Sequence, residues 1–182
     1  GTLGGGGHSA ALLHRLQAGD IVFGCDVDPT AIATSSERLR KYMGHDGSQY
    51  PLFVPVNSNF CDIATVLPSI EYPDSSTPRT ILQDRNGNDR GVDGILLDLG
   101  VSSYQIDEPG RGFSFMKEKN GPLDMRMSGV DSNGLTAADI VNEFDEMELQ
   151  RIFSTYGDEP KSKTIAKAII NHRPMTTTGE LV

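Results

Sequence analysis

Two apolar runs that end on a carboxylate, together with an oligoglycine loop, constrain the fold of this chain most strongly. Residues 21–25 run into Asp26, residues 95–97 run into Asp98, and residues 4–7 are all glycine and precede a helical pattern. An open α/β sheet binds its ligands beyond the carboxyl ends of its parallel strands. We therefore predict an α/β fold in which the glycine loop and both carboxylates meet at one edge of the sheet and form one ligand pocket.

Length and charge limit the classes to which the chain can belong. Its 182 residues provide room for one domain, or for one domain with a small appendage. The formal net charge of −9 argues against nonspecific binding of nucleic acid over an extended surface, because such binding needs a basic face. Basic side chains do gather within 111–126 and within 161–173, where they form either a local binding surface or ordinary solvated charge.

Two further absences in the sequence are informative. Cys25 and Cys61 have no metal-binding spacing and form no disulfide framework, which favours a reducing compartment. The cysteine spacing therefore predicts no metal site. No apolar run approaches the roughly 20 residues that span a bilayer, so we also expect no membrane partner. The chain begins inside a strand-to-loop pattern and stops just after a helix start, so we expect it to be a fragment.

The secondary-structure signals alternate between strands and helices in the first half of the chain and are helical in the second. Pro55 interrupts one apolar run, which favours an edge strand, whereas 92–97 ends without alternation, as buried parallel strands do. Residues 68–90 have a loop composition and are predicted to be a mobile surface insertion without chemistry. We predict strands at 21–25, 52–56 and 92–97, helices at 10–17, 29–42 and 160–171, a structured loop at 105–131, and capped helix starts at Thr136, Asp145 and Thr178.

The glycine loop and Asp26 together indicate an adenosine site. Glycines allow the backbone to approach a ligand closely. Asp26, at the end of the strand predicted at 21–25, is placed to accept hydrogen bonds from ribose hydroxyls. The dinucleotide pattern Gly-x-Gly-x-x-Gly fits poorly, because Leu3 takes the second glycine position in one register and Ser9 takes the third in the other. The alternatives at this point are a flexible loop, a dinucleotide or S-adenosylmethionine.

Three further side chains have a functional and a structural interpretation. Asp98 could face the sulfonium of S-adenosylmethionine or a methyl acceptor, or it could serve as a loop or N-cap carboxylate. Phe60 follows the strand predicted at 52–56, where a ring could cover an adenine face or simply pack in the core. His8 beside the glycines is a ligand contact or a capped loop residue.

The chain resembles the MraW-type methyltransferases, which methylate N4 of a cytosine in small-subunit ribosomal RNA and use S-adenosylmethionine. The resemblance covers nearly the whole chain except 68–90, and its most specific part runs from Asp93 to Met127. The matching segments are 1–9, 26–29 with Ala31 and Ile32, 93–103, 105–107, 111–115, 121–127, 156–159, Ile165 and Ala166, Arg173 and Pro174, and Thr177 and Thr178.

This resemblance implies an α/β fold of the class I, Rossmann-like methyltransferase kind, incomplete in this chain, with a small all-α inserted subdomain. It places an S-adenosylmethionine-binding part at 1–104 and a truncated, RNA-facing loop and helical subdomain at 105–182. It implies a catalytic role for Asp98, which would accept a hydrogen bond from N4 or hold the cofactor amine. The cofactor-binding residues it implies are Gly6, Gly7, His8, Asp26, Phe60, Asp98 and Gln105. The segments 111–115 and 122–127 would wall the cytosine pocket, with the substrate-binding residues Arg111, Phe113, Phe115, Pro122, Asp124 and Arg126.

The departures from the family pattern suggest an alternative function. Tyr104 stands where the family usually has proline, Asp158 replaces a more common glutamate, and the strands that the family has after its helical domain are missing. A truncated, noncatalytic relative that binds cofactor or RNA weakly is therefore the second hypothesis. The long insertion suggests a eukaryotic source, so we expect a cytoplasmic protein if bacterial and a mitochondrial or plastid protein if eukaryotic.

Overall fold

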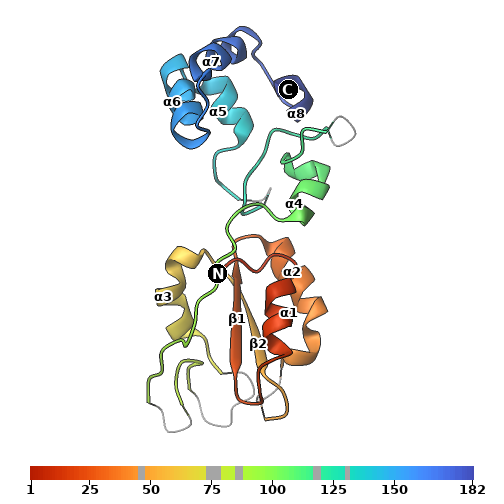
Figure 1. Ribbon diagram of the computed structural model, residues 1–182, viewed down its shortest axis with the longest axis vertical. Helices are drawn as coiled ribbons and strands as arrows, with labels where there is room; N and C mark the ends of the chain where they lie inside the picture. The colour runs from red at the N-terminus through yellow and green to blue at the C-terminus, as the bar shows by residue number, and fades with distance from the viewer. Residues whose placement is uncertain (45–47, 73–78, 85–87, 117–119, 130–131) are drawn as a thin grey trace. The chain divides into compact units, whose positions relative to one another are not determined.

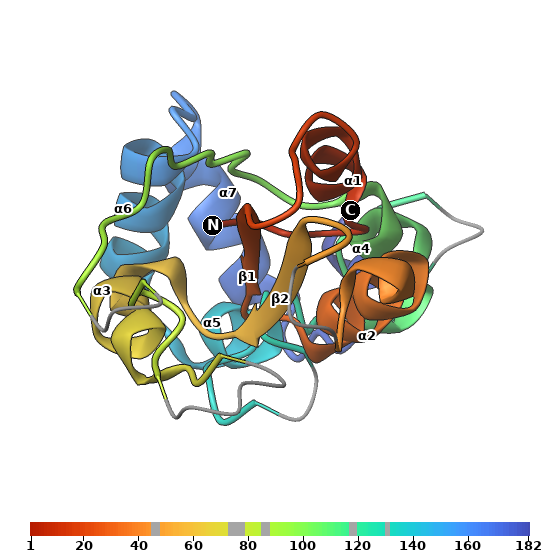
Figure 2. The ribbon, with the colours of Figure 1, turned by 90° about the horizontal axis from the view of Figure 1, so that it is seen from below.

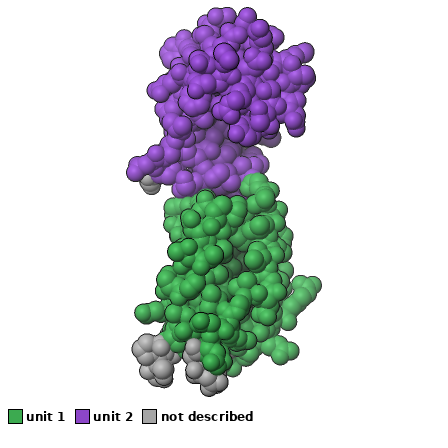
Figure 3. Space-filling view, turned by 90° about the vertical axis from the view of Figure 1, so that its left-hand side faces the viewer, with its two compact units in different colours: residues 1–100 green, residues 101–182 purple. Residues whose placement is uncertain are grey.

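The chain forms two compact units, and each is described by itself (Figure 3). The computed structural model describes residues 1–44, 48–72, 79–84, 88–116, 120–129 and 132–182. The first unit comprises Gly1–Gly100 and the second Val101–Val182, whereas the boundary predicted from the sequence follows residue 104. The predicted helical starts at Thr136, Asp145 and Thr178 all fall in the second unit.

The first unit is built on two parallel strands, β1 (Ile21–Asp26) and β2 (Leu52–Asn57). Their register pairs Ile21 with Leu52 and Asp26 with Asn57, so both strands end at the same edge. β2 pairs only with β1 in the described chain, so both strands are edges of this two-stranded sheet, which is compatible with the edge position predicted from Pro55. This α/β arrangement with a small parallel sheet is the expected incomplete Rossmann-like fold.

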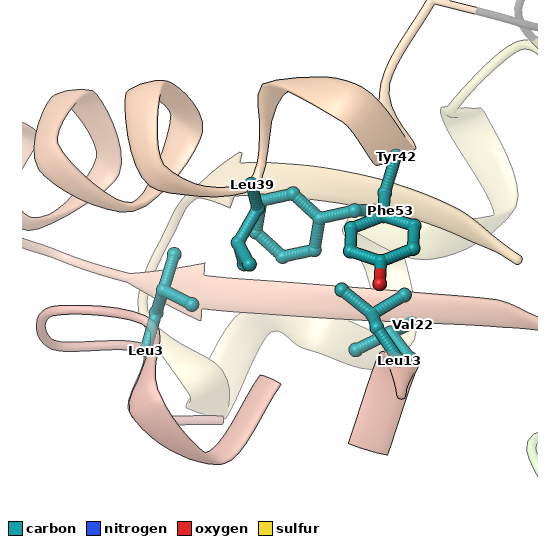
Figure 4. Close-up of a cluster of buried hydrophobic side chains, with 6 residues drawn as sticks. All are labelled: Leu3, Leu13, Val22, Leu39, Tyr42 and Phe53. Carbon is teal, nitrogen blue, oxygen red and sulfur yellow. The ribbon is translucent and has the colours of Figure 1, made fainter. Parts of the chain in front are cut away.

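Helices pack against both faces of this sheet (Figures 1 and 2). One face is covered by α1 (Gly7–Leu13), α2 (Pro29–Arg38) and the 3-10 turn η1 (Arg40–Tyr42). Because neighbouring residues of a strand point to opposite faces, Val22 and Phe53 pack on this side (Figure 4). The buried cluster consists of Leu3, Leu13, Val22, Leu39, Tyr42 and Phe53, and burial of each large side chain contributes about 1.5–3 kcal/mol.

The other face packs on the segment that follows β2. This segment contains η2 (Phe60–Asp62), α3 (Ile63–Val66) and η3 (Leu67–Ser69). The core on this side is formed by Cys25, Val56 and Leu67. Part of the predicted insertion also packs, because Ile81 is only 4% exposed. Its described residues form the antiparallel bridges Glu71–Thr80 and Gln83–Asp89, while 73–78 and 85–87 lie outside the described residues.

The strand predicted at 92–97 is not formed. Among the described residues this segment pairs with no strand, and it is exposed throughout rather than buried, with Ile95 at 74%. Its end is joined to the N-terminal residues, since Gly1 N donates to Leu96 O (2.8 Å) and the amide of the next residue after the segment, Asp98, donates to Thr2 Oγ1 (2.8 Å). An apolar run forms a buried strand only when strands or helices cover it, and no such cover exists in the described chain.

The second unit is a loop followed by packed helices. α4 (Ser103–Asp107) begins before the loop predicted at 105–131 and extends into it, and η4 (Pro109–Arg111) lies within it. The helices α5 (Ala137–Glu143), α6 (Glu146–Tyr156), α7 (Ser162–Asn171) and α8 (Thr178–Leu181) follow. The capping boxes predicted at Thr136 and Asp145 are both formed, which confirms those helix starts. The core contains Leu123, Val141, Leu149, Ala166, Ile169 and Met175.

Candidate functional site

The glycine loop turns sharply between the N-terminal segment and α1. Gly4 and Gly6 have left-handed backbones, with φ of 51° and 74°. A Cβ added at Gly6 would also lie 3.1 Å from Cβ of Ser35, so this position both turns the chain and packs closely on α2. Gly5 and Gly7 are exposed, and a Cβ on either would meet no atom within 4 Å. The loop therefore presents open backbone to solvent on one side and is packed on the other.

Asp26 ties this loop to the end of the sheet. Its Oδ2 accepts the Gly4 amide hydrogen at 2.9 Å, and its Oδ1 accepts that of Asp28 at 3.0 Å. Its backbone carbonyl accepts the Ser58 amide hydrogen at 3.0 Å. Each carboxylate oxygen can accept a second hydrogen bond, so the group that shapes the loop can still accept from ribose hydroxyls.

Asp98 and His8 face each other across the same end of the unit. Asp98 Oδ2 lies 3.6 Å from His8 Nδ1, and the two side chains are 67% and 62% exposed. This distance is too long for a hydrogen bond, so the pair is held loosely and both groups are open to a ligand. The Asp98 backbone is fixed more firmly, by its bond to Thr2 Oγ1, a contact that no sequence motif indicated.

Phe60 lies beside the N-terminal residue. A Cβ added at Gly1 would lie 3.2 Å from Cβ of Phe60 and 2.2 Å from Cδ2 of Leu97. Residues 1–3 are in turn joined to β1 through the Leu3 amide, which donates to the Cys25 carbonyl at 2.9 Å. The structure thus brings the glycine loop, Asp26, Phe60, His8 and Asp98 together around the N-terminal segment. The N-terminus itself lies at the carboxyl end of β1 (Figure 1).

The remaining predicted cofactor residue, Gln105, lies in the second unit and is 5% exposed. Its side-chain oxygen accepts the Ser102 amide hydrogen at 2.9 Å, and Ser102 Oγ accepts the Gln105 amide hydrogen at 3.2 Å. The two residues form a capping box at the start of α4. A structural role therefore accounts for the oxygen of Gln105.

Three of the predicted substrate residues, Arg111, Asp124 and Arg126, form a hydrogen-bonded cluster that we call the brace. Arg111 and Asp124 are 6% and 8% exposed, and the Arg111 Nη2 donates to the carbonyl oxygens of Arg126 and Met127 at 3.0 and 3.1 Å. Asp124 Oδ1 accepts from the backbone and Nε of Arg126 at 3.0 and 2.9 Å. These hydrogen bonds from Arg126 hold the pKa of Asp124 below its ordinary value. The three residues fix the backbone of 124–127.

The other three predicted substrate residues are more accessible. Phe115 is 76% exposed, Pro122 is exposed, and Phe113 is half-buried with its ring centroid 5.9 Å from the Arg111 guanidinium carbon. Met125 lies between the two residues of the Asp124–Arg126 ion pair, within the segment 122–127 that the resemblance implies as a wall of the substrate pocket. Its backbone lies at a φ of 59°, a feature that no composition or spacing pattern signals.

The structure also shows structural contacts for some of the basic side chains at 161–173. Arg173 Nε donates to the Val141 carbonyl at 2.6 Å, and its Nη2 donates to the Phe144 carbonyl. Arg173 therefore stabilises the C-terminal end of α5. Lys167 lies 3.9 Å from Glu146 on α6, whereas Lys163 is exposed on α7. Among the described residues, no helix is long and apolar enough to cross a membrane, and no group of three His, Cys, Asp or Glu side chains could hold a metal.

Comparison with known proteins decides the family. The family model described as the MraW methylase family matches residues 1–182. The chain belongs to the MraW methylase family. This confirms the resemblance that the motifs indicated.

The chain is also similar to curated bacterial proteins named "Ribosomal RNA small subunit methyltransferase H". It is 44% identical over 191 residues to the one from Pelodictyon phaeoclathratiforme and 41% identical over 184 residues to one from Clostridium botulinum. Both alignments cover 100% of this chain but only 50% of the relative. The chain thus spans about half the length of the curated relatives it matches.

Proposed function

We propose that the whole protein transfers a methyl group from S-adenosylmethionine to the N4 amine of a cytosine in small-subunit ribosomal RNA. The observation that carries this proposal is the meeting of the glycine loop, Asp26 and Asp98 at one end of the first unit in a chain of the MraW family. The proposal implies the small ribosomal subunit or its RNA as partner. It also implies a location with bacterial-type ribosomes, which is the cytoplasm of a bacterium or a mitochondrion or plastid.

The chemistry of the donor set fits the cofactor. S-adenosylmethionine carries ribose hydroxyls, an ammonium and a sulfonium, and the first unit offers two carboxylates beside exposed glycine backbone. In our proposal Asp26 binds the ribose, and Phe60, which is 37% exposed, covers the adenine. Gly6, Gly7 and His8 approach the methionine part, and Gln105 remains a predicted contact.

Asp98 is the residue to which we assign catalysis. When bound, the cofactor would supply an electrophilic methyl group that the cytosine amine could attack directly, with the S–C bond breaking as the N–C bond forms, the neutral thioether leaving and one N4 proton passing to solvent, so no covalent enzyme nucleophile is required. Asp98 would accept a hydrogen bond from N4 and direct its lone pair, or would hold the cofactor amine. Positioning of the two reacting atoms would then lower the barrier, by roughly 7–11 kcal/mol at best. The target base must be unstacked to enter the site.

The Asp98 role is tested with full-length protein and labelled cofactor on unmethylated small ribosomal subunits. We expect Asp98→Asn and Asp98→Ala to lower methyl transfer by about 100-fold or more, because the loosely held carboxylate contributes through its charge and position rather than through the core. Binding of the cofactor, measured by calorimetry, separates the two roles. A loss of transfer with unchanged cofactor affinity assigns Asp98 to the cytosine, and transfer at the wild-type rate would refute its role.

A second candidate function concerns the 182-residue chain alone. The segment 92–97 before Asp98 is exposed and pairs with no strand among the described residues, so the backbone leading to Asp98 lacks the sheet neighbours that would support a catalytic residue. We propose that this chain by itself binds cofactor or RNA weakly and transfers methyl groups feebly or not at all. Transfer by the isolated chain at the rate of the full-length protein would exclude this candidate.

A further inference from the structure

Arg38 is an exposed side chain that reaches the glycine loop from the last turn of α2. Its Nη1 donates a hydrogen bond to the Gly5 carbonyl oxygen at 3.0 Å, across 33 positions of the sequence. A cation in the last turn of a helix usually interacts with the carbonyl end of that same helix. Here the guanidinium is directed at a loop that precedes a different helix, so its contact bears on the shape of that loop.

This hydrogen bond fixes one particular peptide of the loop. The Gly5 carbonyl and the Gly6 amide belong to the same planar peptide and point in opposite directions. Arg38 binds the carbonyl, and the Gly6 amide donates to the Leu3 carbonyl at 3.0 Å. The orientation of the Gly5–Gly6 peptide is therefore set at both of its ends.

The orientation of this peptide determines where the neighbouring amides of the loop point. Gly5 and Gly7 are exposed, and within the described chain neither of their amides donates to a protein acceptor. A rotation of the Gly5–Gly6 peptide would change ψ of Gly5 and φ of Gly6 and would move both amides. The contact from Arg38 thus controls the exposed backbone that we propose to meet the cofactor.

The packing of α2 on the loop does not replace this contact. A Cβ added at Gly6 would lie 3.1 Å from Cβ of Ser35 and 3.4 Å from Cδ1 of Leu39, so the chain is closely packed at Gly6. A Cβ added at Gly5 would meet no atom within 4 Å. Packing therefore restrains Gly6, whereas the Gly5 carbonyl is restrained by the hydrogen bond from Arg38.

A restraint of this kind has its largest effect in a loop made of glycine. Glycine has more backbone freedom than any other residue, so a run of four loses the most conformational entropy when it becomes ordered. A loop that is ordered before its ligand arrives binds more tightly, because that entropy is not lost on binding. Arg38 is thus placed to affect ligand affinity while contributing little to the core.

Resting on the proposed function, we propose that Arg38 is a positioning residue that holds the glycine loop in its cofactor-binding conformation. Arg38 acts through the Gly5 carbonyl and does not itself contact the cofactor. Its effect is on affinity for S-adenosylmethionine and not on affinity for RNA.

The first test measures the loop of the full-length protein without any ligand, by hydrogen–deuterium exchange and mass spectrometry. We expect Arg38→Ala to raise the exchange rate of the hydrogen-bonded amides within residues 1–9 by roughly 3- to 10-fold. The melting temperature stays at the wild-type value, because Arg38 is exposed. Arg40→Ala is the matched control, since Arg40 is also exposed and lies 3.8 Å from Glu37, and its exchange in 1–9 should be unchanged.

The second test measures cofactor binding by the same full-length variants, with S-adenosylhomocysteine as the calorimetric probe. We expect Arg38→Ala to raise the Kd of the probe and the KM for S-adenosylmethionine by roughly 3- to 10-fold, while the KM for small ribosomal subunits stays unchanged. Arg38→Lys keeps a donor on a long side chain, so its values should lie between those of the wild type and Arg38→Ala. A merely structural role would instead lower the melting temperature and raise both KM values together.

Wild-type exchange in residues 1–9 of Arg38→Ala, a wild-type Kd for the probe, or equal effects of Arg40→Ala would overturn the proposal. If Arg38→Ala does not fold, Arg38→Lys decides by the same measurements. A full-length wild type that binds the probe but transfers no methyl group contradicts the proposed function instead. The exchange and binding comparisons then still decide the role of Arg38.

Discussion

At the end of β1, the Asp26 carboxylate accepts the amide hydrogens of Gly4 and Asp28 through different oxygens. A substitution there alters the glycine loop and the proposed ribose contact together. The Asp98 side chain differs, because the contact it makes within the first unit is the loose pair with His8. Substitution of Asp98 is therefore the cleaner probe of chemistry, and substitution of Asp26 is a probe of how the loop is built.

Gly112 offers a sharp residue-scale test of the loop that holds the brace. Its φ is 71°, and an added Cβ would lie 2.2 Å from the Pro122 carbonyl oxygen. Backbone must move to accommodate it, so we expect Gly112→Ala to lower the free energy of unfolding by about 3 kcal/mol or more, measured by urea denaturation. Gly91→Ala is the control, because a Cβ there meets no atom within 4 Å. Equal stability of the two variants would show that this close approach does not exist.

At the scale of elements, carboxylates determine where the helices of the second unit begin. Asp139 completes the capping box of α5, and Glu180 accepts the amide hydrogens of Thr176 and Thr177 before α8. In both cases these hydrogen bonds are the main cause that lowers the carboxyl pKa, and for Asp139 the side chain of Thr136 contributes most. These helices therefore begin at their caps because the ionised carboxylates bind otherwise unpaired amide groups.

The same caps predict an acid dependence of stability. A carboxyl whose pKa is lower in the folded chain than in the unfolded chain stabilises the fold above its ordinary pKa, and this contribution is lost as pH falls through that value toward the lower one. We therefore expect the melting temperature to decrease below about pH 4.5. Glu180→Gln keeps a capping side chain but no titration, so its melting temperature should fall less steeply with acid. An identical pH profile would contradict the role of Glu180.

At the scale of the whole chain, the most consequential feature is the exposed apolar segment before Asp98. Ile95 is 74% exposed, and Val92, Leu96 and Leu97 are 45–47% exposed. Extended apolar backbone with unpaired amides and carbonyls is a template for association with other chains. The segment lies directly beside the proposed catalytic residue, so its surroundings bear on catalysis as well as on solubility.

This segment predicts the behaviour of the 182-residue chain in solution. We expect that chain to self-associate with rising concentration and to bind a hydrophobic dye, as measured by light scattering and fluorescence. Ile95→Lys places a charge on the most exposed side chain of the segment and should reduce both signals. Leu12→Lys is the comparison, because Leu12 on α1 is also partly exposed. If it reduces light scattering and dye fluorescence as much as Ile95→Lys does, the segment 92–97 is not the specific cause of self-association.

Local signals in the sequence determined much of this molecule. The apolar run that ends at Asp26, the capping boxes at Thr136 and Asp145, and the helix start at Thr178 each depend on residues within a few positions of one another, so short patterns predict them. The meeting of the glycine loop with Asp26 follows from the rule that ligand sites form at the carboxyl ends of parallel strands, whereas Asp98 lies there through its contacts with Thr2 and His8 and not through a strand.

Tertiary structure decided the rest, because those features depend on partners distant in the sequence. Residues 92–97 have the composition of a buried strand, yet a strand requires neighbours that the described chain does not provide. Arg111 and Asp124 were predicted to bind substrate from their residue types, and only the structure shows that both are buried and that their hydrogen bonds hold the segment 124–127. The left-handed backbone of Met125 exists only because that brace imposes it, so no local pattern could have predicted it.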